Sequence, residues 1–432
     1  MKELVRTERV LTPWVAQGGR TPPVIVRGEG SWLYDDLGKR YLYFSAGLVA
    51  VNLGHGHPGV AAAIAEQAHR LAYVAPTFGN DQRSALADAI IELAPWSEGG
   101  RVFFTTGGGE ANEDAIKLAR TLRGRHKILT AYRSFHGSAP GAGTLSGENR
   151  RWPNEPGLPG IVRFFAPFPY RSPFHTRDAT EETERAIAHL EEIVRYEGAD
   201  RIAALMIEPV VGSNGVIVYP PEYLSRVRDL CDRYGILLIF DEVMTGFGRT
   251  GDAFAAQRFG VVPDILTFAK GVTSAYVPLG GVALRESLAA HFDDRALPSG
   301  HTFSGHPLAM AAGNAALRAY REERLFERAR ELEPQLRSRL EELARRHDVL
   351  GEVRGVGAFF GLELVSDRQT RTPLVPWQGD ATLNKFFGDL LEHGLYIFGR
   401  YNVAIISPPL TISIAEIDEA VAILDGALER LQ

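Results

Sequence analysis

Short apolar segments alternate with segments of helical periodicity from about residue 100 to residue 270, and this alternation constrains the fold more than any other feature of the chain. The apolar segments are RVFFTT, KILTAY, AALMIEP, GILLIFDE and DILTFAK, and helical spacing starts at Glu110 and covers residues 180–197 and 221–234. Continuous apolar strands between helices are typical of βαβ units. We therefore predict an α/β fold with a mostly parallel central sheet and helices on both faces.

The two ends of the chain follow a different pattern. Residues 24–45 alternate between apolar and polar and contain two turn signals, which indicates antiparallel strands. Beyond residue 306, a long helical pattern rich in Leu, Arg and Glu precedes the strand-like GEVRGVGAFFGLELV and a closing helical segment, IAEIDEAVAILDGALERL. The pattern predicts a large α/β domain over residues 59–314 and a smaller α+β domain built from residues 1–58 and 315–432.

The composition is that of a soluble globular protein, because 45% of the 432 residues are hydrophobic and 23% are charged. The net charge of −6 means that the chain lacks the excess of positive charge by which proteins bind nucleic acid or anionic membranes. No apolar run approaches the roughly 20 residues of a membrane span, and the first residues lack the apolar core of a signal peptide. The single cysteine, Cys231, suits a reducing compartment. We expect a cytoplasmic protein without nucleic-acid or membrane partners.

Three of the predicted strands end in residues that can carry chemistry, and ligands bind at the carboxyl ends of parallel strands. The first strand leads into Gly107–Gly109, and a helix follows. Glycines at the start of a helix let its backbone N–H groups bind a phosphate closely. The alternative is a plain turn between the strand and the helix. The second ends at Asp241, which could bind a metal, act as a base, hold a protonated ring nitrogen or cap the following turn. The only nearby candidate for a further metal ligand in the sequence is Glu208. Two carboxylates are too few ligands for a metal ion, so we predict no metal site.

The third strand ends at Lys270, in a chain with 6 Lys against 41 Arg. A lysine after the apolar run 265–269 could snorkel to water, but buried lysines are rare unless they are paired or chemically employed. A phosphate loop, a carboxylate and a lysine are the parts that pyridoxal 5′-phosphate requires, with Lys270 forming the Schiff base and Asp241 keeping the pyridine nitrogen protonated. Phe135 could stack on the ring, whereas His136 alone is more often a structural histidine.

Seven segments, in order, make the sequence resemble the class III aminotransferases of the fold type I pyridoxal-phosphate superfamily over nearly its whole length. They are AGLVAVNLGHGHP (46–58), GGGEANEDAIKLAR (107–120), SFHGS (134–138), IEPVVGSNGV (207–216), FDEVMTGFGRTG (240–251), FAKGV (268–272) and HTFSGHP (301–307). The resemblance implies a pyridoxal-phosphate-dependent transaminase. Its active unit would be a homodimer, or a dimer of dimers, with shared active sites.

The resemblance also implies a role for each residue of the expected site. Lys270 and Asp241 would be catalytic, and Thr302 would reach the phosphate of the neighbouring subunit. The expected cofactor contacts are Lys270, Asp241, Gly108, Gly109, Phe135, His136, Glu208, Val243 and Thr302. Many relatives carry Ser-Gly-Ser or Thr-Gly-Ser where this chain has Gly107–Gly109, so a side-chain hydroxyl toward the phosphate would be missing.

Met244 follows Asp-Glu-Val where branches that handle 4-aminobutyrate, ornithine and acetylornithine often carry Gln. The chain therefore most resembles the amine or ω-amino acid:pyruvate branch, with 4-aminobutyrate, taurine or β-amino acid aminotransferases as alternatives. We expect an amine donor and a keto-acid acceptor, pyruvate first, that exchange the amino group by a ping-pong route. A nicotinamide-dependent oxidoreductase is the alternative from another class, and the missing G-x-G-x-x-G argues against it.

Val49, Phe398 and Arg400 are the expected residues of the substrate pocket. Relatives of the amine:pyruvate type often carry a mobile arginine shortly before the C-terminal Pro-Pro-Leu, and this chain has Phe398 there, with Arg400 two residues on. Residues two apart in a strand lie on the same face of it, so Arg400 could take the place of that arginine. Its planar guanidinium could then bind a keto-acid carboxylate through two parallel hydrogen bonds. The alternative is an apolar pocket built by Phe398 and Tyr401, with Arg400 in solvent.

Overall fold

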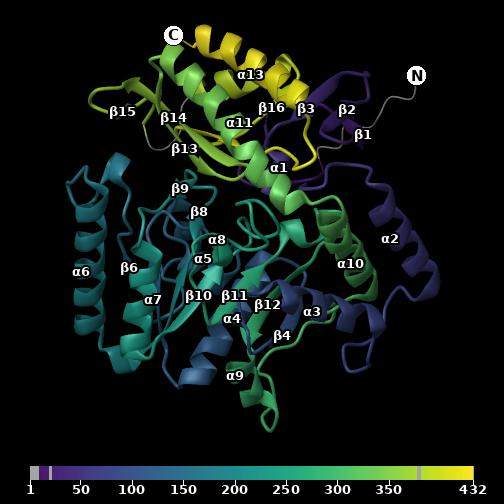
Figure 1. Ribbon diagram of the computed structural model, residues 1–432, viewed down its shortest axis with the longest axis vertical. Coiled ribbons are helices and arrows are strands. Elements are labelled where there is room, and N and C mark those ends of the chain that lie inside the picture. The colour runs from purple at the N-terminus through teal and green to yellow at the C-terminus, as the bar shows by residue number, and fades with distance from the viewer. Residues whose placement is uncertain (1–8, 19–21, 377–380, 432) are drawn as a thin grey trace.

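The middle of the chain forms a large unit, and both ends form a smaller unit stacked on it (Figure 1). The computed structural model describes residues 9–18, 22–376 and 381–431. A seven-stranded sheet with the order β4-β12-β11-β10-β7-β5-β6 forms the centre of the large unit. Its strands are β4 (Gly100–Thr105), β5 (Lys127–Ala131), β6 (Ile161–Phe164), β7 (Ile202–Ile207), β10 (Leu237–Asp241), β11 (Ile265–Phe268) and β12 (Gly280–Arg285).

The sheet is mostly parallel, as predicted. The pairs β10–β11, β10–β7, β5–β7 and β5–β6 are parallel, whereas β12 runs antiparallel to both of its neighbours, β11 and β4. Solved structures at TM-scores above 0.9, described below, share this fold. The predicted fold class is therefore confirmed.

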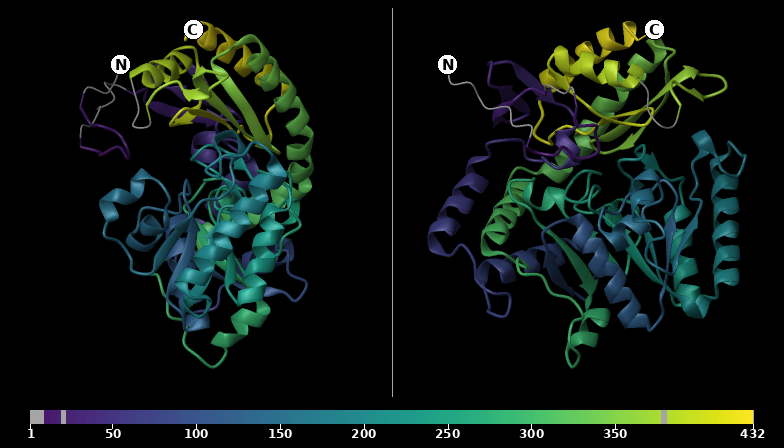
Figure 2. Two further views of the ribbon diagram at one scale, coloured as in Figure 1. Left: turned by 90° about the vertical axis from the view of Figure 1, so that its left-hand side faces the viewer. Right: turned by 180° about the vertical axis from the view of Figure 1, so that it is seen from behind.

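Alternate residues of the strands enter two hydrophobic cores, one on each face of the sheet. Leu238 and Phe240 of β10 belong to the core that α6 (Ala179–Glu197) and α7 (Tyr223–Tyr234) cover. Their neighbours Leu237 and Ile239 belong to the core that α4 (Gly108–Arg123) covers. The period of two follows from the pleat of a strand, and the helices on either side of the sheet are visible in Figure 2.

Strands from both ends of the chain pair with each other in the smaller unit. One sheet contains β1 (Ile25–Glu29), β2 (Trp32–Asp35), β3 (Arg40–Tyr43) and β16 (Leu395–Tyr396), with β16 parallel to β3. The other contains β13 (Leu350–Val356), β14 (Phe359–Asp367), β15 (Thr372–Pro373), β17 (Phe398–Arg400) and β18 (Val403–Ile406). The helices of this unit are α11 (Leu325–Arg346), α12 (Ala381–Glu392) and α13 (Ile414–Glu429).

The remaining regular elements belong to the large unit or to the join between the units. The helices α2 (Pro58–Arg70) and α3 (Asp81–Leu93) pack against α10 (Pro307–Glu322) beside β4. The shorter elements are α1 (Ala46–Val49), α5 (Pro140–Leu145), α8 (Ala255–Arg258), α9 (Glu286–Ala289), β8 (Val210–Val211) and β9 (Ile217–Val218). The predicted domain boundary between residues 314 and 315 falls inside α10, and the division into two domains stays a prediction.

Arg249 joins the two units from a fully buried position. Its Nη1 donates to the carbonyl oxygens of Ala358 at 3.0 Å and Pro408 at 2.6 Å, and its Nη2 donates to Asn52 Oδ1 at 2.5 Å. Asn52 Nδ2 in turn donates to the carbonyl oxygen of Phe247 at 2.9 Å. One guanidinium thus ties the small unit and the N-terminal segment to the loop that follows β10.

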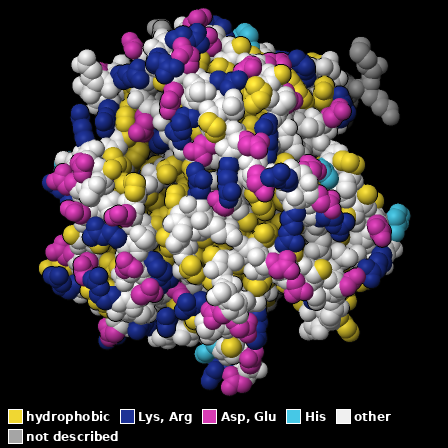
Figure 3. Space-filling view, in the orientation of Figure 1, with side chains coloured by type: hydrophobic (Ala, Val, Ile, Leu, Met, Phe, Trp, Pro, Cys, Tyr) yellow, Lys and Arg dark blue, Asp and Glu magenta, His cyan; other side chains and the backbone are white. Residues whose placement is uncertain are grey.

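The surface carries charged side chains of both signs over both units (Figure 3). Hydrophobic side chains on this face gather across its middle, where the small unit meets the large one. Within the part of the chain that the structure describes, no helix combines the length and apolar character needed to cross a membrane.

Candidate active site

The ends of β10 and β11, the start of α4 and the turn after β5 meet at one cavity of about 410 Å³. In the parallel register of β10 and β11, Asp241 lies opposite Thr267, three residues before Lys270. Neighbouring parallel strands end at the same edge of the sheet, so the carboxylate and the amine reach the same space. The predicted residues that line it are Gly108, Gly109, Phe135, His136, Glu208, Asp241, Val243 and Lys270.

Lys270 begins a short 3₁₀ helix, Lys270–Thr273, with φ at +48°. Among the described residues, no hydrogen bond or ion pair involves its ammonium group. Although the residue keeps some exposure to the cavity, burial lowers the pKa of the Lys270 ammonium to about 8, against the opposing effect of the Asp241 and Glu208 carboxylates. With this pKa about a tenth of the amine is unprotonated at pH 7, far more than for an ordinary lysine, and the unprotonated form is the one that acts as a nucleophile or proton acceptor.

Asp241 is almost completely buried, and both of its oxygens accept hydrogen bonds. Oδ2 lies 2.7 Å from His136 Nδ1 and 2.8 Å from Asn112 Nδ2. Oδ1 accepts from the backbone N–H of Val243 at 3.0 Å. The Val243 bond is the turn-capping contact considered above, and it coexists with two side-chain bonds that a turn does not need. Asn112 and Val243 donate to this carboxylate and His136 Nδ1 lies within hydrogen-bond distance of it, so three partners fix its orientation beside the cavity.

Glu208 is held by the backbone rather than by a cation. Its Oε1 accepts from the N–H of Phe135 at 2.9 Å, and its Oε2 accepts from the N–H of Gly212 at 2.7 Å. Burial, opposed by His136 and assisted by the Asp241 charge, raises the pKa of the Glu208 carboxyl to about 7. Over residues 9–18, 22–376 and 381–431 no group of three His, Cys, Asp or Glu side chains has a geometry that could hold a metal.

Glycines allow three chain segments to approach closely where α4 begins. A Cβ on Gly108 would lie 2.7 Å from Val243 Cγ1, and a Cβ on Gly137 would lie 2.9 Å from Gly109 Cα. No side chain caps the helix at Gly107, so N–H groups of the first turn remain for an anion, which the helix dipole also favours. The residues present fit pyridoxal phosphate, because they offer an anion cradle, a carboxylate and an amine around one cavity.

Four predicted residues lie outside the lining of this cavity. Val49 is buried in a small apolar cluster against which Phe398 packs, and its neighbour Ala50 lines the cavity instead. Thr302 is exposed on the loop before α10, where its carbonyl oxygen accepts from the Tyr73 hydroxyl at 2.9 Å. Arg400 lies on β17 in the polar network described next.

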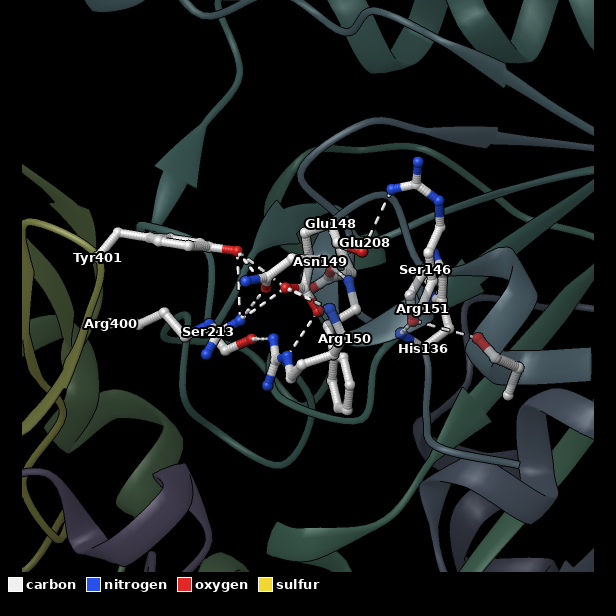
Figure 4. A network of polar contacts seen from close by, with 12 residues as sticks. His136, Ser146, Glu148, Asn149, Arg150, Arg151, Glu208, Ser213, Arg400 and Tyr401 are labelled. Atoms are coloured by element: carbon white, nitrogen blue, oxygen red, sulfur yellow. Dashed lines mark hydrogen bonds and ion pairs between the residues drawn. The ribbon is translucent and has the colours of Figure 1, made fainter. Parts of the chain in front are cut away.

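A polar network contains Arg400 and a second arginine, Arg150 (Figure 4). The buried Glu148 binds both: Oε2 lies 2.6 Å from Arg400 Nη2, and Oε1 lies 2.5 Å from Arg150 Nε. Arg150 Nη2 also donates to Ser213 Oγ at 2.9 Å, and the Arg150 guanidinium carbon lies 3.6 Å from the centre of the Phe135 ring. Burial tends to raise the pKa of the Glu148 carboxyl, but the two arginines lower it overall.

Sequence reasoning missed Asn112, which lines the cavity, and Arg150, which stacks on the lining residue Phe135 but does not line the cavity itself. Asn112 lines the cavity and stands inside the quoted segment GGGEANEDAIKLAR, so its place near the helix start was the available signal. Arg150 stands in the polar stretch GENRRW, where an arginine is unremarkable, and no pattern in the sequence separates it from Arg151.

Comparison with known proteins agrees with this geometry. The family model for class III aminotransferases matches residues 15–428. The taurine–pyruvate aminotransferase of Rhodobacter capsulatus is 36% identical over 432 residues, covering 95% of this chain and 92% of the relative. A taurine:2-oxoglutarate aminotransferase from Bifidobacterium kashiwanohense, solved in complex with PLP and glutamate, superposes with a TM-score of 0.95 at 41% identity, covering 98% of this chain and 96% of that one.

A second solved relative is a thermostable (S)-enantioselective ω-transaminase from Thermomicrobium roseum. Its TM-score is 0.92 at 38% identity, and the match covers 98% of this chain and 96% of that chain. The family match spans nearly the whole chain, and these relatives align with it almost end to end. The chain therefore belongs to the class III aminotransferases.

Proposed function

We propose that this chain is a pyridoxal-phosphate-dependent aminotransferase that moves an amino group from an amine or ω-amino acid to a keto acid, with pyruvate as the first acceptor to test. The observation that carries the proposal is one cavity that contains an amine with a lowered pKa, a buried carboxylate and an uncapped glycine helix start. The nicotinamide-dependent alternative is set aside, because the class III match covers residues 15–428.

Each part of the cavity has a distinct task in this proposal. Bound pyridoxal phosphate would supply a carbonyl that takes up the amino group and a ring that accepts the electrons of a broken C–H bond. Lys270 would hold the cofactor covalently and, once released, carry the proton to and from the substrate carbon. Asp241 would hold a proton on the ring nitrogen through its negative charge. The N–H groups at Gly108 and Gly109 would bind the phosphate.

The same cavity must accept the donor and the acceptor in turn, which is the requirement of a ping-pong route. A panel of donors and acceptors tests the proposal directly, with 1-phenylethylamine, β-alanine, taurine and 4-aminobutyrate against pyruvate and 2-oxoglutarate. We expect pyridoxal phosphate to copurify and at least one pair to turn over. A purified chain that takes up no pyridoxal phosphate and transfers no amino group would overturn the proposal.

We further propose that Arg150, rather than Arg400, binds the anionic end of an acidic substrate. Arg150 is stacked on Phe135, a residue that lines the cavity, whereas Arg400 contacts Glu148, Asn149 and Tyr401, none of which lines it. Burial accounts for most of the lowered pKa of Lys270, and the charge of Arg150 adds to it, as expected for a guanidinium near the amine. Two arginines on one carboxylate leave one net positive charge, which suits a single carboxylate or sulfonate.

Arg150→Met and Arg400→Met separate the two arginines. Either variant leaves Glu148 paired with the other arginine, so the buried carboxylate keeps a cation. A charge-assisted pair contributes about 1.5–3 kcal/mol, so Arg150→Met should raise KM for β-alanine or taurine about 10- to 150-fold. The KM for 1-phenylethylamine should barely change. Half-reaction kinetics that show the effect in Arg400→Met instead would restore Arg400 as the carboxylate-binding residue, as the strand offset predicts.

We also propose that two copies form the active unit, with Thr302 reaching the phosphate bound by the partner. Phe303 is 56% exposed beside Thr302 and packs edge-on against Tyr73, with ring centres 6.1 Å apart. Exposed aromatic side chains grouped in this way are typical of protein interfaces. A cytoplasmic location stays a prediction, based on the single cysteine.

Phe303→Asp should weaken the dimer, and activity and cofactor retention should then fall together on dilution. Tyr196→Asp is the matched control, because Tyr196 is 80% exposed on α6, away from this loop. Sedimentation velocity run in parallel with activity measurements checks the expectation. A monomer with full activity would contradict the shared site.

A further inference from the structure

The side chain of Asn112 connects the ends of β10 and β11 with the turn after β5. Its Nδ2 donates to Asp241 Oδ2 at 2.8 Å and to the carbonyl oxygen of His136 at 2.7 Å. Its Oδ1 accepts from the Thr267 hydroxyl at 2.7 Å. Asn112 is buried, and these bonds use both of its N–H groups and its oxygen. The amide therefore has no spare donor for another task.

Only one orientation of the Asn112 amide satisfies these neighbours. The Asp241 carboxylate and the His136 carbonyl both accept hydrogen bonds, so the NH₂ group must face them. In the flipped orientation the amide oxygen would meet both acceptors, and the NH₂ group would turn toward Thr267. With the NH₂ group held by these two acceptors, Oδ1 faces the Thr267 hydroxyl, which can rotate to donate to it.

The orientation of Asn112 in turn determines how Asp241 presents its charge. Asn112 and His136 both bind Oδ2, while Oδ1 receives one backbone bond from Val243. A carboxylate oxygen can accept two hydrogen bonds, so Oδ1 keeps a lone pair for a further donor, and Asp241 lines the cavity. Loss of a donor on Oδ2 would free the carboxylate to rotate and would weaken the stabilisation of its anion.

We propose that Asn112 is a positioning residue for Asp241 and that the Thr267 hydroxyl holds its amide in place by donating to Oδ1. The proposal rests on the proposed function, in which Asp241 holds the cofactor ring nitrogen. Thr267 belongs to the strand that ends before Lys270, so the relay joins the two strands that carry the carboxylate and the amine. Asn112 acts through Asp241, and its effect should appear in the protonation of the bound ring as well as in rate.

The test compares Thr267→Val with Thr267→Ser in the holoenzyme. Valine matches threonine in shape but cannot donate to Asn112 Oδ1, whereas serine keeps the hydroxyl. We expect kcat to fall at least tenfold in Thr267→Val with KM for the donor changed less than threefold, and near wild-type kinetics in Thr267→Ser. The visible absorption of bound pyridoxal phosphate should shift toward the form with an unprotonated ring in Thr267→Val alone.

Asn112→Asp gives an independent test of the same relay. It puts a second carboxylate at hydrogen-bond distance from Asp241, so the two groups must share a proton and the charge at Oδ1 falls. The pH titration of the cofactor absorption should move in this variant, a response that loss of packing alone does not produce. Thermal melting in the presence of pyridoxal phosphate checks that each variant is folded.

The outcomes separate this proposal from the proposed function. If the wild-type chain neither binds pyridoxal phosphate nor transaminates, the proposed function fails. If the wild type is active and Thr267→Val keeps its kcat and its absorption spectrum, the positioning role is overturned. It is also overturned if Thr267→Ser loses as much activity as Thr267→Val, because the hydroxyl would then not be the cause.

Discussion

Lys270→Ala should lose multiple turnover completely while the fold stays intact. No hydrogen bond or ion pair of the described residues depends on the Lys270 ammonium, and burial lowers the pKa of that group to about 8. Removal of a poorly solvated amine therefore leaves no partner without a bond, so we expect a melting temperature no lower than that of the wild type. Pyridoxal phosphate should still bind at the α4 start, but loosely and without a covalent link.

Borohydride reduction followed by peptide mass analysis measures the covalent link directly. The wild type should carry the reduced cofactor on Lys270, and Lys270→Ala should carry none. Lys39→Ala, a lysine of the small unit whose ammonium donates to the carbonyl of Glu392, is the matched control and should behave as wild type. Sustained turnover by Lys270→Ala would refute the assignment of the site.

Asp241→Asn should bind the cofactor but lose at least two orders of magnitude in kcat. The amide is nearly isosteric but neutral, so it cannot favour a protonated ring nitrogen. The new amide at position 241 also cannot satisfy all three neighbours. If its oxygen accepts from His136 and Asn112, its NH₂ group faces the backbone N–H of Val243, which is another donor. Each ~1.4 kcal/mol of lost transition-state stabilisation slows the reaction about tenfold.

The cofactor absorption spectrum and single-turnover rates check the Asp241 expectation together. The spectrum reports the protonation of the ring, and the single-turnover rate isolates proton removal from substrate binding. Asp241→Asn with a loss smaller than tenfold would mean that Asp241 serves mainly as the cap of the turn at Val243, the alternative that the sequence leaves open.

The parts of the site that depend on local pattern could be predicted from the sequence. Asp241 and Lys270 each follow an apolar run, and the edge rule for parallel strands brings such residues together. The glycine start of α4 also has a local signature, because three consecutive glycines allow a close approach that one would not. The antiparallel strand β12 gives no such signal, since the short run GGVALR suits either direction.

Residues whose role depends on tertiary contact could not be predicted. Arg150 acquires its place from Glu148, two residues away in sequence, and from Phe135, which belongs to a different segment. Asn112 contacts Asp241 and Thr267 across more than a hundred residues of chain. In both cases the residue type is ordinary for its local stretch, and only the packing of the sheet against α4 and the η1 turn (Asn149–Asn154) reveals the contact.

The edge position of β4 affects how the chain folds during its synthesis. Its strand neighbour in the sheet is β12, the last strand of that sheet to be synthesised. At about 5–20 residues per second, β4 leaves the ribosome roughly 10–35 s before β12 does. During that interval the apolar side chains Phe103 and Phe104 have no partner strand, which makes the nascent chain prone to aggregation. The glycine start of α4 is thus synthesised early, but its contacts with β12 form late, and a chain truncated before residue 280 would lack that strand.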